Sequence, residues 1–90
     1  MKLIAVNGPL LLFEVKPKFL DSTWGEVVKI FNPTDNILSP EMFLSSVLAR
    51  GYWEPPPANV MAMKKEWLEK AKKAKQDQRD PRLLYGGVPQ

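Results

Sequence analysis

Two short apolar runs on either side of Asn7-Gly8 constrain the fold of this chain more than any other feature. The runs cover residues 2–6 and 9–15. Asn-Gly supplies the two residues of positive φ that a type I′ turn requires, and apolar runs on both sides of such a turn are typical of a β-hairpin. Pro9 has no N–H, so it belongs at the start of a strand or on an edge. We therefore predict a hairpin over these residues.

The next segment, residues 23–32, fits either a helix or a strand. Thr23 and Glu26 match a capping box, and the apolar residues that follow have helical spacing. Most of those apolar residues are β-branched or aromatic, however, which favours a strand. Because a two-stranded hairpin alone is marginally stable in water, we predict a third strand over 26–32. Residues 33–36 then form a turn on either interpretation.

Two helices are predicted in the second half. Ser39-Pro40-Glu41 offers an N-cap, a proline at the first helical position and an acid in the first turn, and Gly51 marks the end, so the first helix covers 40–50. A stiff connector with three prolines follows. Tyr52 and Trp53, which precede the prolines, are expected to pack on the end of the first helix. The second helix is predicted over 59–76. Its apolar stripe is Val60, Met63, Trp67, Ala71 and Ala74.

These elements predict an α+β fold. An N-terminal β-meander packs against the two helices in a small domain over residues 1–76, and an extended C-terminal arm covers 77–90. A chain of 90 residues has the length of one such domain.

The residue inventory argues against catalysis. The chain contains no His and no Cys, which excludes a disulfide, a Cys/His zinc site, a thiol nucleophile and an imidazole base. The carboxylates are scattered without metal-loop spacing, the serines lack a nucleophile signature, and no glycine-rich loop could hold a phosphate. We predict that the protein is not an enzyme and has no catalytic residue, metal or cofactor.

Positive charge is concentrated on the second helix. Net charge is +3, but residues 64–75 hold six Lys against two Glu, so the rest of the chain sums to −1. At 100° per residue, Met61 and Leu68 share one arc of the helix with four lysines. One interpretation of this pattern is a solvated helix face with partial ion pairing. The other is a surface that binds phosphate groups. Because the face has no Arg, such a surface would not read the edges of the bases. The candidate nucleic-acid contacts are Lys64, Lys65, Lys72 and Lys75.

The arm carries the candidate protein-binding residues. After the polar run of residues 76–82, the apolar triplet Leu83-Leu84-Tyr85 has no helical or strand context that would bury it. The triplet could fold back, stay in water or dock into a neighbour. We expect docking, with Arg79 and Arg82 beside it, as in segments that order on contact.

The uncharged stretches are short. The longest, residues 3–13, is far below the roughly 20 apolar residues of a membrane helix, and no secretory signal is visible. We therefore expect no membrane span and a cytoplasmic or virion location.

No motif identifies a family, but the run Val27-Val28-Lys29-Ile30-Phe31-Asn32-Pro33-Thr34-Asp35 resembles strand-to-turn segments of small tailed-phage virion proteins. This resemblance implies a virion component. We expect a non-catalytic structural or adaptor subunit of a large assembly, with a bacteriophage particle as first candidate, that docks on other protein subunits through its arm and is oligomeric through that assembly. The alternatives are a small nucleic-acid-binding protein that uses the lysine-rich helix, and a small inhibitor or regulator of a protein partner.

Overall fold

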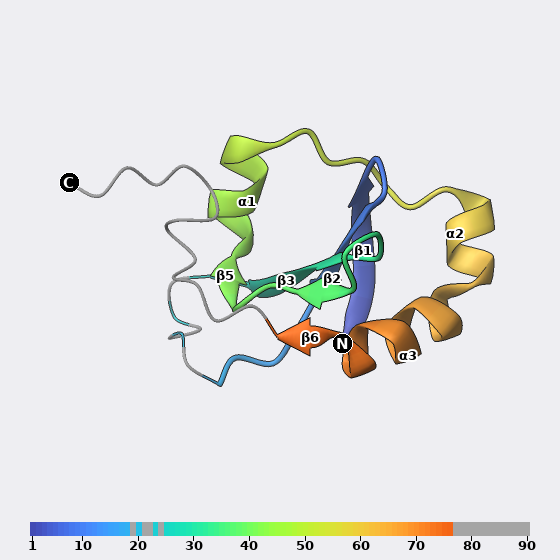
Figure 1. The fold of residues 1–90 in the computed structure, drawn as a ribbon. Coiled ribbons are helices and arrows are strands. Elements are labelled where there is room, and N and C mark those ends of the chain that lie inside the picture. The colour runs from blue at the N-terminus through green and yellow to red at the C-terminus, as the bar shows by residue number, and fades with distance from the viewer. Residues whose placement is uncertain (19, 21–22, 24, 77–90) are drawn as a thin grey trace.

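Six strands and three helices occupy the part of the chain that the computed structural model describes, which is residues 1–18, 20, 23 and 25–76 (Figure 1). In chain order they are β1 (Lys2–Asn7), β2 (Leu10–Glu14), β3 (Val27–Asn32), β4 (Ile37–Leu38), β5 (Met42–Phe43), α1 (Leu44–Arg50), α2 (Ala58–Ala62), α3 (Lys64–Lys73) and β6 (Lys75–Gln76). The strands form one mixed sheet in the order β1-β2-β3-β4-β6, and β5 also pairs with β3. The predicted α+β class is confirmed.

The predicted hairpin is present, but its turn differs from the expected one. Asn7 pairs with Leu10, so the two residues of the turn are Gly8 and Pro9 rather than Asn7 and Gly8. Gly8 has a φ of +60°, whereas the proline ring holds φ near −65°. A positive φ at the first turn residue only is the type II′ pattern, so the predicted type I′ turn is wrong.

An irregularity in β1 decides which side chains face which side of the sheet. Leu3 pairs with Phe13 and Ala5 pairs with Leu12, so Ile4 is an extra residue in the ladder. Side chains three residues apart in a regular strand point to opposite faces. The bulge instead places Leu3 and Val6 in the same apolar cluster.

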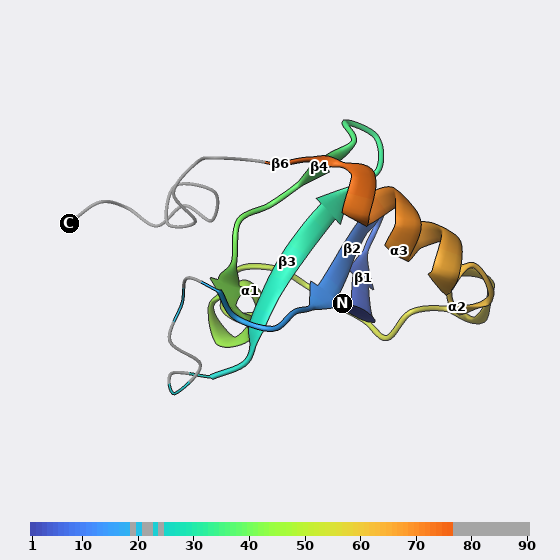
Figure 2. The same ribbon diagram turned by 90° about the horizontal axis from the view of Figure 1, so that it is seen from below.

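Helices cover both faces of the sheet (Figure 2). Leu12 and Val28 pack with Val47 of α1 on one face, whereas Phe13 and Phe31 pack with α3 on the other. Strands buried on both faces read as continuous apolar runs, which explains the composition of β2 and β3. The antiparallel pairing of β2 with β3 also confirms the third strand over its helical alternative.

The predicted helix over 40–50 is correct only from residue 44 onward. Met42 and Phe43 pair with β3, and α1 begins at Leu44. Ser39 is not a helix cap. Its hydroxyl accepts a hydrogen bond from the Ile30 N–H at 2.7 Å, and its N–H donates to the Ile30 carbonyl at 2.8 Å. Because these bonds complete the edge of β3, the segment stays extended where local capping signals favoured a helix.

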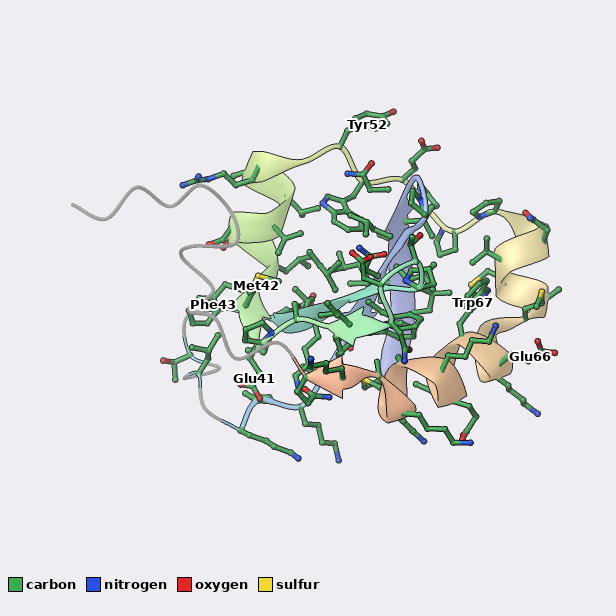
Figure 3. All side chains as sticks on the ribbon, viewed as in Figure 1. Glu41, Met42, Phe43, Tyr52, Glu66 and Trp67 are labelled. Carbon is green, nitrogen blue, oxygen red and sulfur yellow. The ribbon has the colours of Figure 1, made fainter. Side chains whose placement is uncertain are left out.

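The apolar spacing of Phe43, Leu44, Val47 and Leu48 predicts a four-residue core face for this helix, and the observed core face is narrower. Val47 is its one fully buried residue, while Leu48 is 52% exposed. Trp53 packs against the apolar cluster that contains Val47, but Tyr52 is 77% exposed and points away from the fold (Figure 3).

The predicted helix over 59–76 is interrupted. Met63 leaves helical geometry with φ −107° and ψ 19°, which separates α2 from α3. The chain becomes extended at Ala74, and β6 pairs parallel with β4, with the Lys75 N–H donating to the Asn36 carbonyl at 3.0 Å. The edge of β4 has backbone N–H and C=O groups that pair with β6, and a helix that continued to residue 76 would leave these groups unpaired. Ala71 and Ala74 are buried, so α3 approaches the sheet closely at this end.

The predicted arm over 77–90 and the domain boundary before it lie outside the described residues and stay predictions. Within the described ranges, no helix has both the length and the apolar character needed to cross a bilayer.

Candidate binding site

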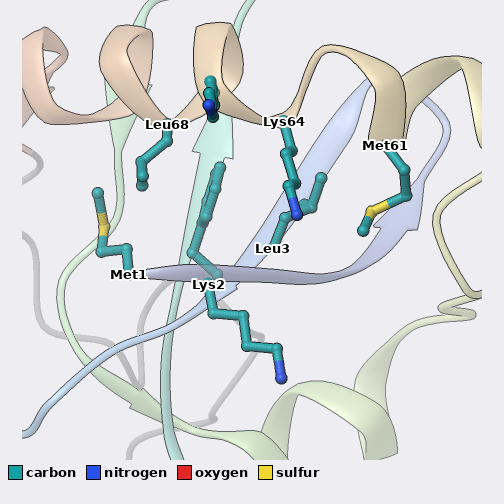
Figure 4. Close-up of a pocket in the computed structure, with 8 residues that line it drawn as sticks. Met1, Lys2, Leu3, Met61, Lys64 and Leu68 are labelled. Carbon is teal, nitrogen blue, oxygen red and sulfur yellow. The ribbon is translucent and has the colours of Figure 1, made fainter.

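A hollow lies between β1 and the α2–α3 pair (Figure 4). Its volume is about 220 Å³. The N-terminal end of the chain and β2 line one wall, and the two helices line the other. The lining residues are Met1, Lys2, Leu3, Phe13, Met61, Lys64, Lys65 and Leu68.

The floor of the hollow is apolar and firmly held. Leu3 and Phe13 form a cross-strand pair on the face that α3 covers, and they are 7% and 0% exposed. The rim is apolar but accessible, since Met1 and Met61 are 40% and 38% exposed. Methionine side chains adapt easily to the shape of a neighbour, so this rim suits an apolar ligand group.

Positive charge lies beside this apolar surface. Lys64 and Lys65 are exposed residues of the first turn of α3, where the helix dipole disfavours cations and Glu66 is the one acidic residue. Figure 4 shows the Lys64 side chain reaching from the helix toward β1, while the Lys2 side chain points away from the helices. Lys72 forms a salt bridge with Glu69, whereas neither Lys64 nor Lys65 has an ion-pair partner among the residues that the structure describes.

The side chains that line the hollow offer apolar surface and positive charge. None of the lining residues carries a carboxylate, hydroxyl or thiol group. Lysines that act as nucleophiles are desolvated, whereas Lys64 and Lys65 are exposed. An apolar cavity with cations at its rim matches a ligand that joins a large apolar group to an anion.

The four candidate nucleic-acid lysines do not form one continuous face. Lys64 and Lys65 lie at the hollow, but Lys72 contacts Glu69, with 3.9 Å between Nζ and Oε1. Lys75 has left the helix and belongs to β6. Lys70, which was not a candidate, places its Nζ 4.9 Å from the centroid of the Trp67 ring. The candidate protein-binding residues are outside the described part of the chain: Arg79, Arg82, Leu83, Leu84 and Tyr85.

Sequence reasoning missed half of the hollow. The sequence identified the lysines and placed Met61 and Leu68 on the same helical arc. Apolar residues within a charged helical face were a usable signal of a contact surface there. Nothing local indicated Met1, Leu3 or Phe13, which reach the site only through the packing of β1 and β2 under the helices.

Glu41 is a buried acidic residue outside the hollow, and its role is structural. It is 4% exposed, and its carboxylate accepts hydrogen bonds from the N–H groups of Lys18 at 2.8 Å and Leu20 at 3.2 Å. A buried carboxylate with such donors anchors the loop that follows β2. Across residues 1–18, 20, 23 and 25–76, side chains that could share a metal ion do not gather in groups of three or more.

Comparisons of the chain with protein-family models, with curated proteins and with solved structures find no match.

Proposed function

We propose that this protein is a non-catalytic adaptor subunit that binds an acidic, partly apolar segment of another protein at the hollow between β1 and α2–α3. The observation that carries the proposal is an accessible apolar cavity with Lys64 and Lys65 at its rim. Unpaired cations beside apolar surface favour a partner that supplies carboxylates and an apolar anchor together.

The size of the hollow favours a protein segment over a free small molecule. Pockets for drug-sized ligands have volumes of roughly 300–1,000 Å³. A cavity of about 220 Å³ has room for one large side chain and little more. The remaining contacts then have to come from the surface around it, as in the docking of a peptide.

The setting of this adaptor is a further part of the proposal. We propose a large assembly, with a tailed-phage particle as first candidate, on the basis of the resemblance of residues 27–35, which form β3 and the start of the following turn. Docking through the arm would be tested by replacing Leu83, Leu84 and Tyr85 with Ser in the full chain. Loss of the chain from purified particles would support docking through the arm, and unchanged incorporation would exclude the triplet as the anchor. If the protein instead regulates a single partner, that partner would bind at the hollow and the protein would not be part of a particle.

Nucleic-acid binding is the competing function, and one experiment separates the two. The probes are a labelled hexapeptide, acetyl-Glu-Thr-Phe-Thr-Glu-Thr-amide, and a labelled duplex DNA. The variants are Lys64→Glu/Lys65→Glu at the hollow and Lys72→Glu/Lys73→Glu farther along α3, which change the net charge equally.

We expect the hollow variant to weaken peptide binding by about tenfold, since two exposed charge pairs become repulsive. The control variant should change the dissociation constant by less than about twofold, because its lysines lie outside the hollow. Equal loss in both variants, together with tight binding of the duplex, would contradict the proposal and favour a nucleic-acid partner.

A further inference from the structure

We infer that the acidic partner segment binds as an added β-strand on the outer edge of β1 and places one side chain in the hollow. This inference rests on the proposed function and specifies how the partner is held.

The outer edge of β1 is open beside the hollow. β1 is an edge strand of the sheet, and its inner edge pairs with β2. Among the described residues, its outer edge pairs only at Val6, which exchanges two backbone hydrogen bonds of 2.9 and 3.0 Å with Glu54. The backbone groups of residues 2–5 that face outward therefore have no strand beside them.

Three prolines keep the chain itself from covering this edge. Glu54 pairs antiparallel with Val6, so the residues after Glu54 run toward the N-terminal half of β1. Those residues are Pro55, Pro56 and Pro57, which have no N–H to donate to a ladder. The connector leaves β1 and enters α2 instead.

The open edge and the hollow belong to one surface. Lys2 and Leu3 line the hollow and also begin β1, at the end whose outer edge has no strand beside it (Figure 4). The bulge at Ile4 turns Leu3 toward the helices and so into the floor of the hollow. A strand laid along this edge would pass the mouth of the hollow and below the first turn of α3.

Charge decides between the possible occupants of the edge. A second copy of this chain, paired through β1, would continue the sheet and bring Lys64 and Lys65 of both copies to the same face, which is unfavourable. An acidic segment of a different protein meets the same lysines favourably. Side chains of a strand alternate between its faces, so the partner should carry a large apolar residue with acidic residues two positions away on either side.

Backbone methylation of the probe tests this geometry. The hexapeptide described above has Glu, Phe and Glu on one face. Two isomers are made, one N-methylated at positions 1, 3 and 5 and the other at positions 2, 4 and 6. N–H groups of successive strand residues point to opposite edges, so only one isomer blocks the bonds to β1.

We expect the unmodified peptide to bind, one isomer to lose at least about tenfold in affinity, and the other to stay within about threefold. In ¹⁵N-labelled full-length protein, amide exchange at outward-facing positions of residues 2–5 should slow on addition of the unmodified peptide. Equal affinity of both isomers would overturn the added strand while leaving binding at the hollow intact. Absence of binding by the unmodified peptide up to about 1 mM would overturn both proposals.

Discussion

The two faces of the sheet are closed to different degrees, although each is covered by helix. On the face under α1, Leu12, Val28 and Val47 are completely buried, and Trp53 extends the cover. The face under α2 and α3 is closed at the β4 end, where Ala71 and Ala74 lie, and open at the β1 end, where the hollow lies.

The size of the helical side chains explains this difference. Alanine has no side chain beyond Cβ, so the C-terminal end of α3 lies close to the sheet. At the other end, the residues directed to the sheet are longer, and the break at Met63 redirects α2. The α3 helix thus packs on the sheet at one end and borders the hollow at the other.

The strongest test of the comparison removes one fully buried side chain from each face. Leu12→Ala should cost about 2–5 kcal/mol and Phe31→Ala about 3–5 kcal/mol, because both leave cavities in closely packed clusters. Urea titrations followed by tryptophan fluorescence measure both. A cost below about 1 kcal/mol for Phe31→Ala would mean that the α3 face is loosely packed along its whole length.

A second test compares the two ends of α3. Ala71→Leu should cost about 1–3 kcal/mol, because Ala71 is 0% exposed and a larger side chain would push the helix from the sheet. Leu68→Phe should cost about 0.5 kcal/mol or less, since the added atoms can enter the hollow. Thermal unfolding of both variants is the measurement. Equal costs would show that the hollow has no space for a larger group.

The smallest effects distinguish the charges at these two ends. Lys64→Gln should raise the free energy of unfolding by up to about 0.5 kcal/mol, because it removes a cation from the first turn of α3. Lys72→Gln should lower it by a similar amount or less, because it removes an exposed contact with Glu69. Opposite signs in precise urea titrations at low salt support the comparison. A loss of stability in Lys64→Gln would indicate a stabilising partner for Lys64.

Much of the fold was predictable from local features. The apolar runs on either side of Asn7-Gly8 indicated β1 and β2, and β-branched and aromatic residues indicated β3. The lysine-rich helical segment was predictable too, together with Met61 and Leu68 among its charges. These features are local because turn geometry, strand propensity and helical periodicity act over a few residues.

Other features were decided by tertiary contacts. Residues 40–43 carry good signals for a helix start. In the structure, however, Ser39 and β5 form hydrogen bonds and strand pairs with β3, and this keeps the segment extended. The second helix was also predicted to continue to residue 76, but it ends at Lys73, and residues 75–76 pair with β4 instead.

The sequence by itself determined an α+β chain with a concentrated positive charge and without histidine or cysteine. Tertiary structure alone decided that Met1 and Leu3 would meet Met61 and Lys64 across a hollow. The physical reason is that local propensities differ by about 1 kcal/mol or less per residue, whereas pairing a strand edge and burying an apolar face involve many residues at once. Where the two conflict, the contacts between distant segments prevail.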